Sequence, residues 1–172
     1  MVSGLAKQGR YAGQCRKFYS IAEHLVHCRD LAAMSGASSV ERRHVLIHDA
    51  HEAWNHDISR PLKRGLPQYR AISDMIQEAV LMRFGMDDTG WHERIKRYDN
   101  ALLKAEMQQL LPSEGSKLNI PGDVPDTNIR IRCFGPRRSA MMLWLALEEE
   151  GFVVLPWWKS FGLRLLKFAR II

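Results

Sequence analysis

The segment from residue 46 to residue 63, LIHDAHEAWNHDISRPLK, concentrates side chains that can bind metals or move protons. It contains three histidines, two aspartates and one glutamate among residues that otherwise have the spacing of the inward face of a helix. Polar groups beside a hydrophobic core are costly unless they pair with one another or with a metal. The segment therefore indicates an ion-pair network or a metal site.

One candidate metal site combines residues from separate predicted helices. His48 and Asp49 are adjacent, His24 borders the apolar stripe of the preceding helix, and Asp99 lies within the apolar stripe of a later one. Imidazole nitrogens and carboxylate oxygens together can hold a divalent ion such as manganese, cobalt, zinc or magnesium. A carboxylate in a core stripe also needs a cation or hydrogen-bond donors. Two simpler readings stay open: a core histidine at position 24, and an ion pair of Asp99 with a lysine or arginine.

A second set of histidines competes with that site. His44, His48 and His51 are spaced at i, i+4 and i+7, so they could bind zinc from a single helix. This set gives no role to Asp49 or Asp99. We therefore favour the ligands drawn from separate helices.

Two capping boxes, which begin at Ser20 and Ser38, mark the helices that must position these residues. The first predicts a helix over 20–35, and the second predicts a helix from 38 to about 54. The residues of the first helix expected to face away from its apolar stripe are Glu23, His27 and Asp30.

Two prolines and one glycine lie in 57–67, which we predict to be a loop. Four prolines and three glycines lie in 112–136, which we predict to be mostly irregular with a short extended piece at 128–131. No alternation of strands and helices appears along the chain, so the predicted fold class is all-α. The remaining helices are predicted over about 68–84, 90–111 and 136–151.

Composition narrows the class of protein. The 172 residues suffice for one domain with a buried core. The net charge of +6 and the pI near 9.5 favour an anionic partner, whether nucleotide, nucleic acid or acidic membrane. The cysteines at 15, 28 and 133 form no CxxC pair, which argues for a reducing compartment and against a thiolate zinc site. No secretory signal or membrane-spanning run is evident, so we expect a cytoplasmic protein without a transmembrane segment.

The order His24, His48–Asp49 and Asp99 resembles the H…HD…D signature of the HD-domain metal-dependent phosphohydrolases. FYSIAEH is similar to the segment that leads to the family's first ligand. LIHDAHEAWNHDISRPLK is similar to the run that begins with the His-Asp pair in the nucleotidase branch of the family. RYDNALLKAE resembles the helix that carries the last aspartate. These segments occur in the family's order over about residues 10–111.

The resemblance implies a compact HD-domain helical bundle that forms a single domain over residues 1–172. Its core would span about 10–111, with an additional helix at 136–151 and a basic amphipathic tail at 152–172. That tail could rest on an acidic membrane or a partner subunit, although packing on its own bundle is the simpler expectation.

The resemblance also implies roles for individual residues. Glu52, one turn after His48, would position or deprotonate the attacking water, a role for which it has the reach. The family's Arg-Trp pair is replaced here by Arg10–Tyr11, so the aromatic that would stack on a base differs. In full, the implied metal ligands are His24, His48, Asp49 and Asp99, the catalytic residues are Glu52 and Asp57, and the substrate-binding residues are Arg10, Tyr11, Pro61 and Lys63.

Two branches of the family resemble the chain in size and spacing: phage dATP triphosphohydrolases and bacterial 5'-deoxynucleotidases. They imply metal-dependent hydrolysis of deoxynucleotides at the 5' phosphoester, with dATP giving deoxyadenosine and triphosphate, or alternatively with deoxynucleoside monophosphates as substrates. A non-enzymatic alternative is a basic helical module that binds nucleic acid. For the enzyme, we expect a homo-oligomer in the cytoplasm (the host cytoplasm if phage-encoded). It would have a deoxynucleotide substrate and no stable nucleic-acid partner.

Overall fold

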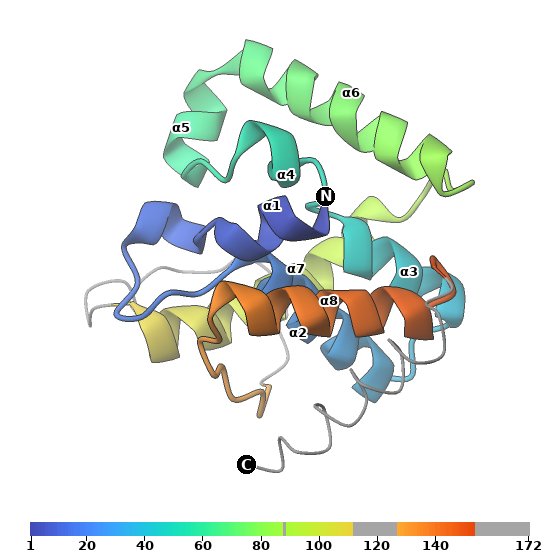
Figure 1. The fold of residues 1–172 in the computed structure, drawn as a ribbon. Helices are drawn as coiled ribbons and strands as arrows, with labels where there is room; N and C mark the ends of the chain where they lie inside the picture. Colours follow the sequence, from blue (N-terminus) through green and yellow to red (C-terminus); the bar gives the residue numbers. More distant parts are fainter. Residues whose placement is uncertain (88, 112–126, 154–172) are drawn as a thin grey trace.

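A bundle of helices makes up the structure, a computed structural model that describes residues 1–87, 89–111 and 127–153 (Figure 1). In these ranges the regular elements are helices, and one isolated bridge pairs Gly9 with Ser20. The all-α prediction is therefore confirmed. The elements are α1 (Val2–Lys7), a 3-10 turn η1 (Arg10–Gly13), α2 (Ile21–Met34), α3 (Ser39–Ile47), α4 (Glu52–Asn55), α5 (Arg60–Gly65), α6 (Pro67–Arg83), α7 (His92–Leu110) and α8 (Pro136–Glu149).

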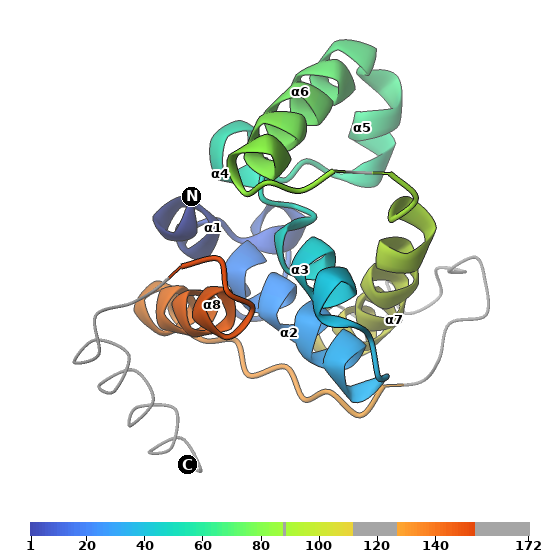
Figure 2. The same ribbon diagram turned by 90° about the vertical axis from the view of Figure 1, so that its right-hand side faces the viewer.

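The helix α2 lies at the centre of the bundle. It contacts α1, α3, α7 and α8, and two views at right angles show it between α8 on one side and α3 and α7 on the other (Figures 1 and 2). The Ser20 hydroxyl accepts a hydrogen bond from Glu23 N–H at 3.1 Å, so the first predicted capping box does begin this helix. Because neighbours cover most of α2, His24 lies in the interior.

The prediction that one face of α2 points away from the core was wrong for Glu23 and His27. Both are buried, and the Glu23 carboxylate accepts hydrogen bonds from the N–H groups of Cys133 and Phe134 at 3.0 and 2.8 Å. The segment before α8 therefore covers this face. Only Asp30 of the three residues remains partly exposed.

The second capping box is also present, since Ser38 accepts from Glu41 N–H at 3.2 Å, but the helix that it starts is shorter than predicted. α3 ends at Ile47 instead of continuing to about residue 54. The next backbone bonds join residues three apart, with Glu52 N–H donating to Asp49 O at 3.1 Å. This tighter turn, typical of 3-10 geometry, separates α3 from the short α4.

The segment 57–67 was predicted to be a loop, and this was wrong because it contains α5. Both of its prolines stand in the first turn of a helix, Pro61 in α5 and Pro67 in α6. Proline is favoured there because its fixed φ suits the helix and its missing N–H would have no partner. The helices predicted over 68–84, 90–111 and 136–151 correspond to α6, α7 and α8.

Residues 128–131 do not join a sheet among the described residues. Instead the Gln109 side chain holds this segment, donating to Ile129 O at 2.9 Å and accepting from Ile131 N–H at 3.0 Å. The predictions for residues 112–126 and for most of the basic tail, 154–172, lie outside the described residues.

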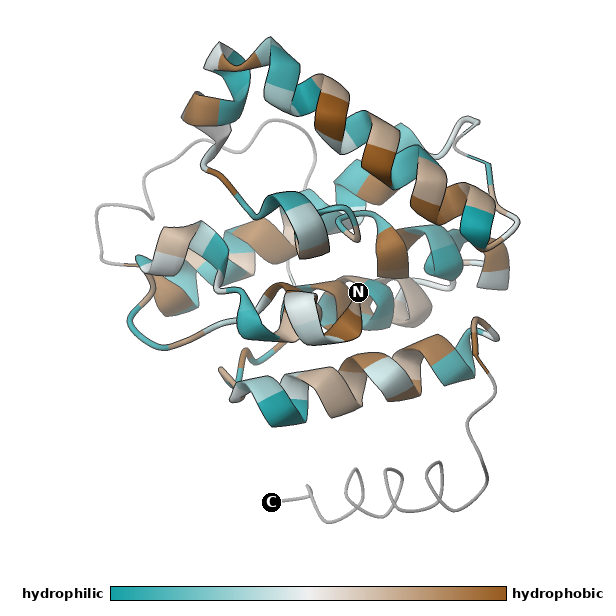
Figure 3. Cartoon of the chain, turned by 45° about the horizontal axis from the view of Figure 1, so that its top comes forward, coloured by the Kyte–Doolittle hydropathy of each residue, from teal (hydrophilic) through white to brown (hydrophobic). Residues whose placement is uncertain are grey.

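The apolar core falls into two main clusters that meet on α2. One joins α2 to α1, α3 and α8, and the other joins α2 to α3 and α7. The long helix α6, at the top of Figure 3, also carries apolar residues on its surface, among them Ile72, Met75 and Met82. Within the described ranges, no helix has the length and apolar character needed to cross a membrane.

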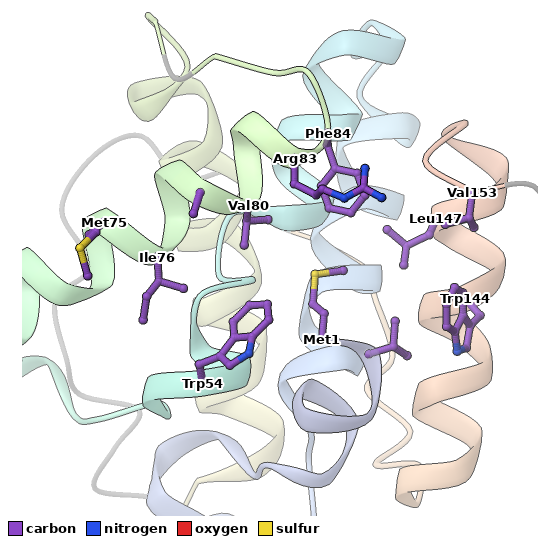
Figure 4. A pocket seen from close by; sticks show the side chains of 12 residues that line it. Met1, Trp54, Met75, Ile76, Val80, Arg83, Phe84, Trp144, Leu147 and Val153 are labelled. Carbon is purple, nitrogen blue, oxygen red and sulfur yellow. The ribbon is translucent and has the colours of Figure 1, made fainter.

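An apolar cavity of about 840 Å³ lies between α1, α4, α6 and α8. Figure 4 shows Trp54 and Met75 on one side and Trp144 and Leu147 of α8 on the other, with Met1 between them. None of the histidines or acids singled out from the sequence lines this cavity. The chemistry-bearing residues gather elsewhere, at the junction of α2, α3 and α7.

Candidate functional site

Two imidazoles from different parts of the chain turn their Nε2 atoms toward the same region. His24 Nδ1 lies 2.6 Å from a carboxylate oxygen of Glu106, and His48 Nδ1 lies 2.8 Å from the backbone oxygen of Val45. Both partners are acceptors, so each Nδ1 carries the proton and donates it. Nε2 is then the atom left for a metal, which is the usual arrangement around metal-bound histidines.

Two carboxylates meet these imidazoles. Asp99 Oδ1 lies 3.4 Å from His24 Nε2, while Asp49 Oδ2 lies 3.3 Å from His48 Nε2 and 3.8 Å from His24 Nε2. The Nε2 atom of His48 is buried and faces Asp49 without a hydrogen bond of standard geometry among the described residues, so a metal ion there would supply its partner. The four ligands implied by the sequence therefore lie together, and their donor set suits a divalent ion.

A proton and a divalent ion would compete for His48. Burial alone would lower the pKa of His48, but the neighbouring carboxylate of Asp49 outweighs it and raises that pKa to about 9. Metal ligands must be deprotonated, so an ion that binds Nε2 has to displace this proton.

Cys28 adds a sulfur to the cluster. The ligand atoms of His24, Cys28, His48 and Asp99 all lie within 4.8 Å of one another and could hold a metal ion. Cys28 Sγ is 3.6 Å from His24 Nε2. From the sequence, Cys28 was considered as one of three cysteines that form no CxxC pair and was not expected at the metal site. Its position four residues after His24, one helical turn away, was the signal that could have placed it here.

The competing set of histidines on one helix lacks the continuous helix that it requires, because α3 ends before His51. His44 is buried and stacks on the Trp91 ring, with centroids 4.6 Å apart.

Glu52, which is buried, and Lys63, which is partly exposed, form an ion pair beside the cluster. Lys63 Nζ lies 2.8 Å from Glu52 Oε1 and 3.5 Å from Asp57 Oδ1, so the two predicted catalytic carboxylates share one cation. Glu52 is only 1% exposed. Burial, followed by the charges of Asp49 and Asp57, raises the pKa of Glu52 to about 8 despite Lys63. A carboxyl group that takes up its proton near neutral pH is suited to act as a general base.

Glu106 is a buried acid to which the sequence analysis assigned no role. It bonds to His24 on α2, to the hydroxyls of Tyr11 and Tyr19, and to the guanidinium of Arg10, whose Nη2 is 3.4 Å away. Burial alone would raise the pKa of Glu106, but the charges of Arg10 and His24 and these hydrogen bonds lower it to about 2. The available signal was its place in the same apolar stripe as Asp99.

The residues predicted to bind substrate lie in different settings. The Arg10 guanidinium is buried, with Nη1 3.5 Å from Asp49 Oδ2. Tyr11 is partly exposed, and its N–H donates to Asp57 Oδ2 at 3.3 Å. Lys63 is directed at the two carboxylates predicted to be catalytic, Glu52 and Asp57. The side chain of Pro61 lies outside the described part of the structure.

A hollow of about 470 Å³ opens beside the candidate metal centre. His48, Asp49 and Asp99 contribute to its wall, and so do the cationic side chains of Arg64 and Lys96. Asp74 lines the hollow as well, so an anionic ligand there would meet Arg64 and Lys96 together with one further acid beside the candidate metal ligands.

Comparison with known proteins finds sequence similarity but no matching family model. The chain is 32% identical over 120 residues to the protein named "Uncharacterized protein YfdR" of Escherichia coli (strain K12), a match that covers 70% of this chain. It spans 64% of that relative's length. The name of the relative states no activity, so the function has to be argued from the site.

Proposed function

We propose that the chain is a metal-dependent phosphohydrolase that cleaves deoxynucleotides at the 5' phosphoester. The main support is the convergence of the Nε2 atoms of His24 and His48 on the carboxylates of Asp49 and Asp99. These residues would hold a divalent ion: manganese, cobalt, zinc or magnesium. Such an ion supplies Lewis-acid polarisation of a phosphoryl oxygen and makes water a better nucleophile at neutral pH.

Glu52 is the proposed general base. In the reaction, the oxygen of a water molecule bonds to the α-phosphorus and Glu52 takes the water's proton. The bond from that phosphorus to the 5' oxygen breaks, and the 5' oxygen leaves as the hydroxyl of the deoxynucleoside with a proton from bulk water. Lys63, 2.8 Å from Glu52, holds the base in place. Asp57, 3.5 Å from Lys63 Nζ, is proposed to act on the leaving oxygen, as the resemblance to the HD family implies.

The preferred substrate in this proposal is a deoxynucleoside triphosphate, dATP in particular. Attack at the α-phosphorus would release deoxyadenosine and intact triphosphate. The β- and γ-phosphates need cationic cover, and Arg64 and Lys96 line the hollow beside the ligands. Hydrolysis of deoxynucleoside monophosphates is the nearest alternative.

Product analysis tests the proposal. Metal-free protein is supplied in turn with each of the four divalent ions and with dATP, other deoxynucleoside triphosphates and dAMP. We expect deoxyadenosine and triphosphate from dATP, with no release from Glu52→Ala. Orthophosphate from dAMP, with dATP inert, would move the protein to the monophosphatase reaction and leave the site assignment intact. Absence of hydrolysis with every ion, together with salt-dependent binding to DNA, would favour the nucleic-acid module instead.

A further inference from the structure

We propose that Glu106 is the positioning residue of the candidate metal centre and that it couples the ligand His24 to the turn η1. The inference rests on the proposed function only in requiring a divalent ion at His24. It assigns to Glu106 no contact with substrate.

Every acceptor position of this carboxylate has a donor. Glu106 is fully buried, and its Oε1 accepts from His24 Nδ1 at 2.6 Å and from the Tyr19 hydroxyl at 2.7 Å. Oε2 accepts from the Tyr11 hydroxyl and pairs with Arg10 Nη2 at 3.4 Å. An ionised carboxylate has about four lone-pair sites, and these four groups occupy them. A glutamine would replace one oxygen by an NH₂ group that faces donors.

The hydrogen bond between His24 and Glu106 determines the tautomer and the ring orientation of this metal ligand. A carboxylate that accepts from Nδ1–H fixes the tautomer with a free Nε2, orients the ring and makes Nε2 a stronger base. His24 is itself fully buried, and its Nε2 faces Asp99 and Asp49 at 3.4 and 3.8 Å. Glu106 therefore keeps the imidazole in the orientation that brings Nε2 to the other ligands.

The contacts of the other oxygen, Glu106 Oε2, hold the backbone of η1 in its conformation. Tyr11 and Ala12 have φ angles of 57° and 50°, and Gly13 follows at 77°, so three successive residues are left-handed. Two of them carry a Cβ, and non-glycine residues adopt this conformation only where surrounding contacts hold it. The Tyr11 hydroxyl and the Arg10 guanidinium supply such contacts through Glu106. Arg10 and Tyr11, two of the four residues that the HD-family resemblance assigns to substrate, are thus held by the carboxylate that also holds His24.

Glu23 offers a matched control. It too is a fully buried carboxylate, one residue before His24, but it accepts from the N–H groups of Cys133 and Phe134. Replacing either acid by glutamine leaves buried donors poorly satisfied and lowers stability. Only the loss of Glu106 should also change metal binding.

Cobalt binding by the full chain provides the test, with dissociation constants for Co²⁺ measured by competition with a chelator. We expect Glu106→Gln to raise the Kd by about 10- to 100-fold, as loss of such a partner typically does, and Glu23→Gln to leave it unchanged within a few-fold. Should Glu106→Gln fail to fold, Glu106→Asp keeps the buried charge but withdraws it from Nδ1, and the same loss is expected.

Tyr11→Phe tests the second half of the coupling. It removes one bond to Glu106 and keeps the ring, so trypsin should cleave after the buried Arg10 faster than in the wild type, and Glu23→Gln should show no such change. Equal cobalt affinity in the wild type and the Glu106 variant, or equal losses in the Glu106 and Glu23 variants, overturns the positioning role. Unchanged cleavage in Tyr11→Phe overturns the coupling to η1. A wild-type protein that binds no cobalt at His24 would remove the metal premise, and the proposed function with it.

Discussion

Replacing Glu52 by glutamine is expected to remove hydrolysis and yet to make the metal-free protein more stable near pH 7. The carboxyl is 1% exposed, its Oε2 has no hydrogen-bond partner among the described residues, and Asp49 and Asp57 lie close to it. Burial, with these two charges, raises the pKa of Glu52 from 4.5 to about 8. Glutamine has nearly the same shape but never ionises.

The direction of the pH dependence follows from proton binding. In the unfolded chain Glu52 loses its proton near pH 4.5, whereas in the folded chain it keeps it to about pH 8. The folded state binds more protons in this window, so the free energy of unfolding falls as the pH rises through it. At about 1.4 kcal/mol per pH unit, Glu52 lowers the free energy of unfolding by roughly 3 kcal/mol at pH 7 and by less than about 1 kcal/mol at pH 5.

The effect on Lys63 reduces the stability gained by Glu52→Gln. In the variant, Lys63 Nζ loses its charged partner at 2.8 Å and keeps only Asp57 at 3.5 Å. Its side chain is 30% exposed, so water compensates for part of that loss. We therefore expect Glu52→Gln to stabilise the protein by about 2 kcal/mol at pH 7, or roughly 4–8 °C in Tm for a chain of this size.

Urea unfolding of chelator-treated protein at pH 5 and pH 7 measures the effect. The difference between Glu52→Gln and the wild type should be small at pH 5 and grow toward pH 7. Glu78→Gln, which changes an exposed acid on α6, serves as the control and should leave the pH dependence unaltered. A variant less stable than the wild type at pH 7, or a difference that does not change with pH, would refute the reasoning.

Three further predictions concern the metal and the packing of α1. Exhaustive chelation should abolish hydrolysis and a divalent ion should restore it; undiminished turnover in protein shown by elemental analysis to be metal-free would exclude a metal-dependent mechanism. Asp99→Asn should lose both metal and turnover, whereas His44→Ala should cost stability, because His44 is buried on Trp91, yet retain the metal; the reverse result in elemental analysis would favour the single-helix histidines. Gly4→Ala should lower the Tm even though alanine favours helix, since its Cβ would lie 2.9 Å from Ala53 O, while Gly65→Ala, whose Cβ meets nothing within 4 Å, should not.

Local signals in the sequence were enough to predict where helices begin. The hydroxyls of Ser20 and Ser38 cap the helices that follow them, as their capping boxes indicate, because such a motif satisfies the backbone from within a few residues. Helix ends were less predictable. The apolar spacing continues past Ile47, where the backbone changes to bonds between residues three apart. Prolines were interpreted as loop residues when Pro67 in fact begins a helix.

The candidate site, like the helices, was predictable only in part. Residue types suggested that His24, His48–Asp49 and Asp99 lie close together, and the resemblance to the HD signature implied the full set of four. The partners of Glu106 could not be predicted, because they depend on how closely α7 approaches α2 and on the path of η1, neither of which has a periodic signature. A buried acid in an apolar stripe indicates that a partner exists without identifying it.

The order in which the site residues leave the ribosome has a consequence for metal loading. His24, His48 and Asp49 are made early, whereas Asp99 and Glu106 both lie on α7. At about 5–20 residues per second, the 57 positions from residue 49 to residue 106 take roughly 3 to 11 s to synthesise. During that interval the nascent chain has both imidazoles but lacks Glu106, the proposed acceptor for His24, and for most of it the chain also lacks Asp99. An ion met in this period would bind weakly and could be exchanged. We therefore expect the metal to be selected only after α7 has been synthesised. The ion that is abundant when the helices pack together would then occupy the site.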